Sequence, residues 1–286
     1  MTSTPTYGFI GLGHQGTPMA ERLISTSMRP WIWARRAEVL DRYRDADARL
    51  AASPDELGAR CDVIGLCLYD ADATDAVLFG PNGLMTSIRP GTILCLHATG
   101  GPDYVTDLAT RVHDRGVRVV DAPVSGGDEA ATGNLLVMVG GSDDDIAACT
   151  PMFRTYAGKV VKVGGLGAAQ AVKLINNALM TAITGLVFDS FDLGERFGVD
   201  PERLGEVLSG GSAANPSVGY YLALGGAEQF SIRAWPTLHK DVELVETVTD
   251  GSPLGQSLLV TSAVTTIGEM ARRRARWVEE RGRRDS

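Results

Sequence analysis

Short apolar runs alternate with amphipathic stretches through the first half of the chain. Each run is typical of a strand, and helical stretches follow the first run to about Met28 and the second from about Ala37. This alternation predicts βαβ units in a mostly parallel, doubly wound sheet, whose continuous apolar strands are buried on both faces. The predicted strands are "YGFIG" (7–11), "WIWA" (31–34), "DVIGLCL" (62–68), "GTILCLH" (91–97), "GVRVVDAPV" (116–124), "LLVMVGG" (135–141) and "KVVKVGG" (159–165).

The pattern changes after about Gly164, where strand-like runs give way to long helical segments separated by glycine and proline. We therefore predict an α/β domain over residues 1–164, followed by an all-helical domain over residues 165–286. The helices of the second domain are predicted at about 168–197, 201–209, 216–224, 235–249 and 253–280.

Composition narrows the class of protein without naming a function. The chain has 286 residues, of which 44% are hydrophobic and 22% charged, as in ordinary globular proteins. Its net charge of −8 argues against nucleic acid as the main partner, and the basic "RRRARWVEERGRR" (272–284) is interpreted as a helix end. The four cysteines form no CxxC pair, so neither a disulfide scaffold nor a zinc site is expected. No site for another metal is expected either. We find no signal peptide and expect no membrane span, which favours the cytoplasm.

A glycine-rich turn follows the first predicted strand. Gly11, Gly13 and Gly16 have the GxGxxG spacing, and a helix is predicted directly after them. In this context Gly11 permits a tight turn, Gly13 lets the backbone approach a pyrophosphate, and Gly16 lets the helix pack on the strand. The turn therefore predicts a Rossmann-type dinucleotide site. Its candidate cofactor contacts also include Leu12, His14, Gln15 and Leu68.

The end of the second predicted strand bears on which dinucleotide binds. NAD sites usually carry an acidic residue there, which bonds the ribose hydroxyl. This chain has Arg35 and Arg36 instead, and the first acid is Glu38, inside the next helix. Two guanidinium groups suit a 2′-phosphate, so the sequence favours NADP, with NAD as the alternative.

Two further segments carry candidate substrate residues. Ser125, Gly126 and Gly127 could present a hydroxyl and two N–H groups to a carboxylate, or form an ordinary turn. Lys173 and Asn177 share one face of a largely apolar helix. Lys173 could be a snorkelling lysine, but its apolar neighbours favour a partly buried group suited to proton transfer.

Four blocks then match one known family in order and spacing: "GFIGLGHQG" (8–16), "DAPVSGG" (121–127), "GGLGAAQAVKLINN" (164–177) and "LHKDVELV" (238–245). The chain resembles the β-hydroxyacid dehydrogenases, which include 3-hydroxyisobutyrate dehydrogenase and tartronate semialdehyde reductase. The resemblance implies a Rossmann-type domain followed by a helical domain, in a homodimer or homotetramer. It also implies hydride transfer between nicotinamide and a small β-hydroxyacid or its semialdehyde or keto partner.

The resemblance also implies roles for individual residues. Lys173 would be the catalytic acid/base, and Asn177 would help to hold the substrate. Lys240 would approach the cofactor or substrate from the helical domain. Thr99 would lie near the nicotinamide, and Arg35 matches an arginine associated with NADP. The substrate carboxylate would bind at Ser125, Gly126 and Gly127.

The chain departs from the family pattern at several positions, which leaves the substrate unspecified. Leu96 and Ala98 replace an acid and a serine, Tyr69 replaces a proline, and Gln15 replaces a methionine. His97 could belong to a proton relay, but a histidine at a strand end is more often a local hydrogen-bonding group, which we favour. An imine reductase on the same fold and a cofactor-binding protein without catalysis are the alternatives. Lys173 counts against the first, and the joint presence of Ser125, Lys173, Asn177 and Lys240 counts against the second.

Overall fold

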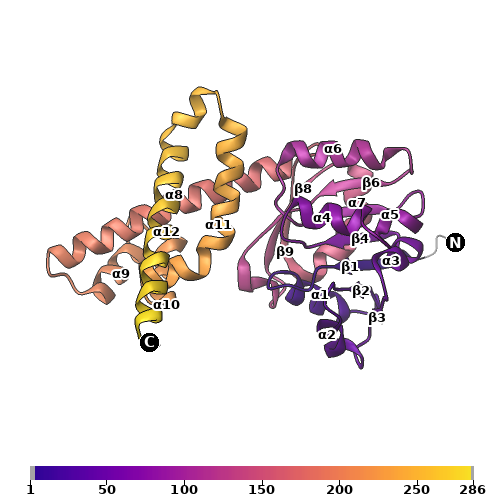
Figure 1. The fold of residues 1–286 in the computed structure, drawn as a ribbon, viewed down its shortest axis with the longest axis horizontal. Helices are drawn as coiled ribbons and strands as arrows, with labels where there is room; N and C mark the ends of the chain where they lie inside the picture. Colours follow the sequence, from indigo (N-terminus) through magenta and orange to yellow (C-terminus); the bar gives the residue numbers. More distant parts are fainter. Residues whose placement is uncertain (1–3, 285–286) are drawn as a thin grey trace. The chain divides into compact units, whose positions relative to one another are not determined.

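The computed structural model describes residues 4–284, without the side chains of residues 128 and 280–284. The chain forms two compact units, Met1–Lys173 and Leu174–Ser286 (Figure 1). The long helix α8, Ala168–Arg196, begins in the first unit and continues into the second. The predicted domain boundary, after residue 164, lies just before this helix.

The first unit contains one sheet with the strand order β3-β2-β1-β4-β5-β6-β8-β7, and β9 pairs with β8. All neighbours from β3 to β6 are parallel, and the order 3-2-1-4-5-6 is that of a doubly wound dinucleotide-binding sheet. The predicted fold class is thereby confirmed. The strands are β1 (Tyr7–Ile10), β2 (Trp31–Trp33), β3 (Arg49–Leu50), β4 (Val63–Leu66), β5 (Ile93–Leu96), β6 (Arg118–Asp121), β7 (Val124–Ser125), β8 (Leu135–Gly140) and β9 (Ala157–Gly164).

Helices cover both faces of this sheet, because successive strand residues point to opposite sides. Phe9 packs in one core with α1 and α7, whereas Ile10 packs in the other with α3 to α6. Both side chains are fully buried, as the continuous apolar runs predict. The helices are α1 (Gly16–Ile24), α2 (Ala37–Leu40), α3 (Pro54–Arg60), α4 (Ala71–Phe79), α5 (Leu84–Ser87), α6 (Pro102–His113) and α7 (Asp143–Tyr156).

The sheet differs from the prediction in two places. The run 116–124 forms two strands, β6 and β7, rather than one, and Pro123, which has no N–H to donate, lies between them. Both strands pair antiparallel with β8, so the sheet is mixed at this side. The two-residue strand β3 was not predicted, because a run this short carries no periodic signal.

The described residues of the second unit form helices joined by turns, with no strand among them, as predicted. Its elements are α8, α9 (Pro201–Gly210), α10 (Pro216–Leu224), α11 (Ala227–Thr249), the short 3-10 helix η3 (Pro253–Gln256) and α12 (Leu258–Arg284). The predicted start of α11 at residue 235 was wrong, because Pro236 lies inside this helix, which begins after Gly225 and Gly226 with positive φ. The segment predicted as one helix from 253 is divided between η3 and α12.

Helices α8 and α12 approach each other closely at Gly185. A Cβ atom there would lie 2.0 Å from the hydroxyl oxygen of Thr266, so no larger residue fits without a shift. The aromatic side chains of Phe188 and Phe230 fill the adjoining core, with ring centroids 5.6 Å apart.

Among residues 4–284, α8 is the helix that is long and apolar enough to cross a membrane by length and composition. By length and composition alone, α8 therefore meets the test for a membrane span, which was not expected from the sequence. However, 44% of the most apolar stretch of α8 is buried inside the protein. A core helix has the same composition, so the hydropathy of α8 is weak support for a membrane span.

Candidate active site

The carboxyl ends of the parallel strands bring together several predicted site residues. Gly11 follows β1, Arg35 follows β2, Leu68 follows β4 and Thr99 follows β5. Parallel strands place their carboxyl ends at the same edge of the sheet, where doubly wound proteins bind their ligands. The first unit thus collects its candidate cofactor residues along one edge.

The glycine turn between β1 and α1 requires glycine at two positions. Gly11 has a φ of 101°, and a Cβ atom there would lie 2.1 Å from the carbonyl oxygen of Cys67. At Gly16 a Cβ atom would lie 1.8 Å from the carbonyl oxygen of Gly11. By contrast, beyond Gly13 and its two chain neighbours, no atom lies within 4 Å of the Cβ position at Gly13. The turn is tight on the protein side and open at Gly13, which fits a pyrophosphate beside the N-terminus of α1.

The other residues of this turn differ in what they can offer a cofactor. Leu12 is buried, so its backbone rather than its side chain is available, whereas His14 is exposed. The Gln15 amide nitrogen lies 3.5 Å from the carbonyl oxygen of Gly127, at the limit of a hydrogen bond. Through this contact, Gln15 connects the glycine turn to the loop that is predicted to bind the substrate carboxylate.

Arg35 and Arg36 are both exposed, directly before the single-turn helix α2. Glu38 is in the first turn of that helix, as predicted. Two guanidinium groups at the end of β2 give this part of the edge a positive potential.

The loop that begins at Ser125 is built on glycine conformations. Ser125 is the last residue of β7, and Gly126 and Gly127 follow with φ values of 132° and 52°. The N–H of Glu129 donates to the carbonyl oxygen of Gly126 at 3.0 Å, which closes a turn. The loop is therefore a defined turn whose glycines cannot be exchanged without strain.

Asp121, which sequence reasoning did not select, holds the start of α8. Its carboxylate is fully buried and accepts hydrogen bonds from the backbone N–H groups of Gly167, Ala169 and Gln170, at 3.1, 2.8 and 3.0 Å. Burial raises the pKa of Asp121, and the three N–H groups oppose that rise. Because Asp121 is the last residue of β6, it ties the edge of the sheet to the helix that carries Lys173.

Lys173 lies on α8 about one turn after this clamp and is partly exposed. Its apolar neighbours differ in exposure: Leu174 is buried, whereas Ile175 is 58% exposed. Asn177 follows Lys173 by four residues and therefore shares its helix face. The boundary between the two compact units falls between Lys173 and Leu174.

In the second unit, Asn177 and Lys240 meet at one carboxylate, that of Asp241. The side-chain amide of Asn177 donates to one carboxylate oxygen at 2.5 Å, and the Nζ of Lys240 lies 2.9 Å from the other. Asn177 and Asp241 are both buried. Asp241 was not selected as a functional residue, although it stands next to Lys240 in the "LHKDVELV" block. It fixes two side chains that sequence reasoning assigned to the substrate.

His97 is a buried hydrogen-bonding group, which confirms the favoured interpretation. Its Nδ1 lies 2.7 Å from the carbonyl oxygen of Ala122, and its Nε2 lies 3.1 Å from the hydroxyl of Tyr156. The ring stacks on Phe9 with centroids 6.0 Å apart. Burial lowers the pKa of His97 to about 4, although its bond to Ala122 opposes the shift. The imidazole is therefore neutral at pH 7.

The other departures from the family pattern have different surroundings. Leu96 is buried in the sheet core, and Tyr69 is 57% exposed. The carbonyl oxygen of Ala98 accepts a hydrogen bond from the Gln170 side chain. Leu96 thus contributes packing, whereas Ala98 takes part in a polar contact through its backbone.

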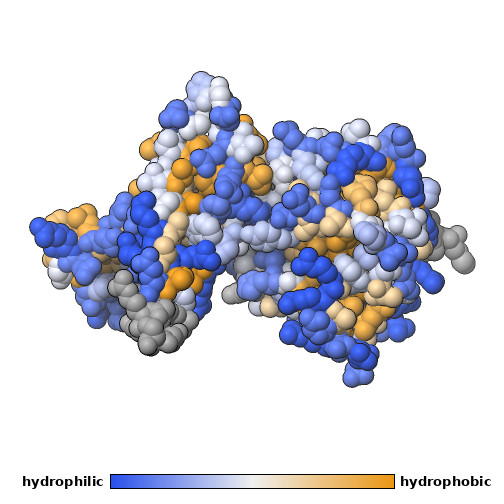
Figure 2. Space-filling view, viewed as in Figure 1, coloured by the Kyte–Doolittle hydropathy of each residue, from blue (hydrophilic) through white to orange (hydrophobic). Residues whose placement is uncertain are grey.

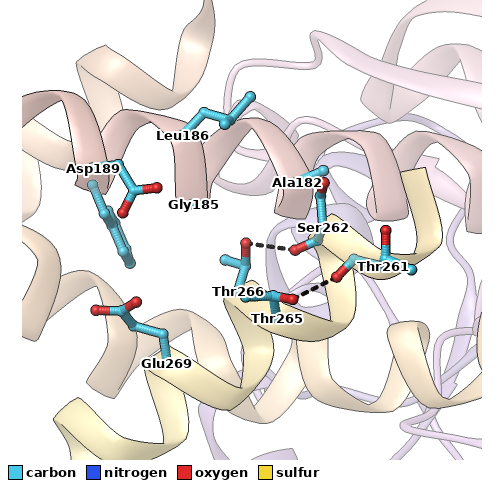
Figure 3. A pocket seen from close by; sticks show the side chains of 10 residues that line it. Ala182, Gly185, Leu186, Asp189, Thr261, Ser262, Thr265, Thr266 and Glu269 are labelled. Carbon is cyan, nitrogen blue, oxygen red and sulfur yellow. Dashed lines mark hydrogen bonds between the residues drawn. The ribbon is translucent and has the colours of Figure 1, made fainter. Parts of the chain in front are cut away.

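A surface pocket in the second unit holds none of the predicted site residues (Figure 3). It lies between α8 and α12, with Asp189 and Glu269 on opposite sides. The hydroxyls of Thr265 and Thr266 donate to carbonyl oxygens one turn back in α12, at 2.7 and 2.8 Å, so they are already bonded. Within the described part of the chain, no group of three or more His, Cys, Asp or Glu residues could hold a metal ion.

Comparison with known families identifies both units. Residues 6–165 match the NAD binding domain of 6-phosphogluconate dehydrogenase. Residues 167–278 match the NAD-binding domain of NADP-dependent 3-hydroxyisobutyrate dehydrogenase. The two matches meet at the glycine segment before α8.

Individual relatives extend this likeness. L-threonate dehydrogenase of Cupriavidus necator is 37% identical over 71% of this chain and 69% of its own length. Mitochondrial 3-hydroxyisobutyrate dehydrogenase of Mus musculus is 33% identical over 73% of this chain, but the match spans only 63% of that enzyme. The structure of 3-hydroxyisobutyrate dehydrogenase of Mycobacterium tuberculosis with L-serine has a TM-score of 0.79 and 22% identity, and covers 94% of each chain. At that identity the structure supports the fold alone.

Proposed function

Because the chain belongs to the β-hydroxyacid dehydrogenase family of NAD(P)-dependent dehydrogenases, we propose that it transfers a hydride between NADP and a small β-hydroxyacid. The reverse reaction reduces the matching semialdehyde or keto acid. The observation that carries this proposal is the arrangement at the carboxyl edge of the sheet. There the open side of Gly13, the loop of Ser125 and the clamped start of the Lys173 helix belong to the same compact unit.

Each residue set contributes a separate task. The nicotinamide, when bound, supplies or accepts the hydride. Lys173 takes the hydroxyl proton during oxidation and returns a proton to the carbonyl oxygen during reduction. Ser125, Gly126 and Gly127 orient the substrate carboxylate, which fixes the carbon that reacts.

Asn177 and Lys240 hold the substrate from the helical unit, and their shared contact with Asp241 fixes the positions of both side chains. Thr99, at the end of β5, contacts the cofactor near its reactive ring. The paired arginines at residues 35 and 36 bind the 2′-phosphate, which favours NADP over NAD.

The test is a substrate screen with purified protein. Short β-hydroxyacids, including L-threonate and 3-hydroxyisobutyrate, are offered with NADP or NAD, and the matching aldehydes with NADPH or NADH, while absorbance at the nicotinamide band is followed. We expect turnover of at least one three- or four-carbon acid, faster with NADP than with NAD. Turnover of cyclic imines without turnover of any hydroxyacid would contradict the proposal and favour an imine reductase.

The surface of α8 supports a homodimer or homotetramer. Exposed apolar side chains recur along this helix, and Figure 2 shows apolar surface on the second unit. They are Ile175, Leu179, Leu186 and Leu193, and the exposed Phe197 follows directly after the helix. A monomer with full activity, measured by light scattering at micromolar concentration, would contradict this expectation.

We also place the protein in the cytoplasm. All four cysteines are free thiols, which fits a reducing compartment. Recovery of the protein in the membrane fraction after cell breakage would contradict this location.

A further inference from the structure

Gln170, the third residue of α8, is fully buried and bonded through both atoms of its side-chain amide. Its amide oxygen accepts from the backbone N–H of Gly100 at 3.1 Å, and its amide nitrogen donates to the carbonyl of Ala98 at 2.9 Å. These two backbone groups stand on either side of Thr99. The side chain therefore holds the peptide segment that carries Thr99.

The same residue is also held through its backbone. The N–H of Gln170 donates to the carboxylate of Asp121 at 3.0 Å. Gln170 thus connects the segment after β5, the end of β6 and the first turn of α8. Lys173 follows three residues later on the same helix and is the last residue of the first unit. All these contacts therefore lie within that unit.

Few side chains could make both contacts. Glutamine offers one donor and one acceptor at the end of a two-carbon stem. Asparagine is one methylene shorter, ionised glutamate has no donor for Ala98, and leucine has neither group. A buried backbone group that loses its partner remains unsatisfied, so its segment shifts to find another one.

We infer that Gln170 is a positioning residue, which holds Thr99 and Lys173 in one fixed arrangement. This inference rests on the proposed function for the roles of Thr99 and Lys173. Gln170 itself acts through the two segments that it joins.

The test compares Gln170→Leu with Gln170→Glu across a range of pH. In Gln170→Leu both bonds are lost, and kcat should fall roughly tenfold to a hundredfold, since small misplacements of reacting groups cost this much. In Gln170→Glu the carboxylate cannot donate at high pH. Once protonated, it can donate to Ala98 and accept from Gly100, which restores both bonds.

The activity of Gln170→Glu relative to the parent protein should therefore recover as pH falls from about 8 to about 6. Burial and the carboxylate of Asp121 both raise the pKa of the introduced glutamate, which brings its titration towards this range. The titratable groups on the elements that meet here are Asp121 on β6, His97 after β5, Tyr104 on α6 and Lys173 on α8. The introduced carboxylate raises the pKa of Asp121 in return, so the recovery in Gln170→Glu reports on this pair of acids. The ionisation of the other three groups is common to the parent and both variants and cancels in the ratio of activities.

Gln256→Leu and Gln256→Glu are the matched controls, because Gln256 is exposed in the second unit. Neither control should show a change in kcat or a pH-dependent recovery. Urea unfolding of each variant shows whether it is folded. If Gln170→Leu does not fold, the pH profile of Gln170→Glu decides alone.

Fluorescence of bound NADPH gives a second measurement that needs no substrate. Its intensity should differ from the parent in Gln170→Leu, and should return to the parent value at low pH in Gln170→Glu. If the parent protein turns over no hydroxyacid, the proposed function fails, and this fluorescence still decides on Gln170. Identical pH profiles for the two variants, or a parental kcat in Gln170→Leu, would overturn the inference.

Discussion

The two units present their candidate functional residues in different ways. The first unit uses mainly backbone: the positive φ of Gly11, the open side of Gly13 and the N–H groups bound to Asp121. The second unit uses side chains on two helices, where Asn177 and Lys240 meet at the carboxylate of Asp241.

This difference determines how each unit should respond to substitution. A site made of backbone tolerates changes of side chain except where a Cβ atom has no room, as at Gly11. A site made of buried charged and polar side chains loses a partner with every change. Four predictions test this comparison.

The largest effect is expected from Lys173, the side chain of the first unit that we propose moves the proton. Lys173→Ala should lower turnover by about a hundred- to ten-thousandfold, because it removes the proposed general acid/base. Affinity for NADPH should persist, since the glycine turn is unchanged. Lys162→Ala is the matched control, because Lys162 forms an exposed ion pair with Asp143. A loss of less than about tenfold, with the fold intact, would show that Lys173 is not the acid/base.

The second prediction concerns the second unit, where a contact between side chains should be sensitive to the loss of one partner. Asp241→Ala leaves the amide of Asn177 and the ammonium of Lys240 without this partner, and should lower the free energy of unfolding by about 3 kcal/mol. Urea unfolding measures this change, with the exposed Glu246→Ala as control. An unchanged midpoint would mean that the contacts of Asp241 add no net stability.

A buried titratable side chain of the first unit should make stability depend on pH. The pKa of His97 is about 4 in the folded protein and 6.5 in its ordinary state. Between these values the unfolded chain binds more protons, so stability rises with pH, and falls by up to about 3 kcal/mol as pH drops from 6.5 to 4.

Urea unfolding of the parent and of His97→Asn, at several pH values in this range, checks the prediction. The difference between the two curves isolates His97, because the opposite contribution from the raised pKa of Asp121 is common to both. Parallel curves would contradict the neutral, buried state of His97.

The smallest expected effect concerns the choice between NADP and NAD. We propose that this choice depends on the side chain of Arg35, at the carboxyl edge of the sheet. Arg35→Ala should weaken NADPH binding by roughly ten- to a hundredfold, equivalent to about 1.5–3 kcal/mol for one charge-assisted contact. NADH binding should change much less. Arg29→Ala, which removes an exposed pair with Asp47, is the control. Equal dissociation constants for NADPH and NADH in the parent protein would refute the assignment of Arg35.

The same difference explains what could be predicted from the sequence. The strands and the glycine turn were predictable because their signals are local, as with Gly11, whose conformation belongs to one turn. The contact of Asn177 with Asp241 joins residues 64 positions apart, and that of Gln170 with Gly100 joins residues 70 apart. No local pattern specifies such pairs. The start of α11 was missed for a related reason, because Pro236 is accommodated within a helix whose packing outweighs the usual break.

The bond between Asp121 and the first turn of α8 also limits how the gene can be divided into fragments. A cut at residue 166, between the two family matches, would separate the Asp121 carboxylate from the N–H groups of Gly167, Ala169 and Gln170. A fragment of the nucleotide-binding unit that ends there would bury an acid with none of these donors. A fragment extended through Lys173 keeps all three, because the compact unit extends past the boundary between the two matches.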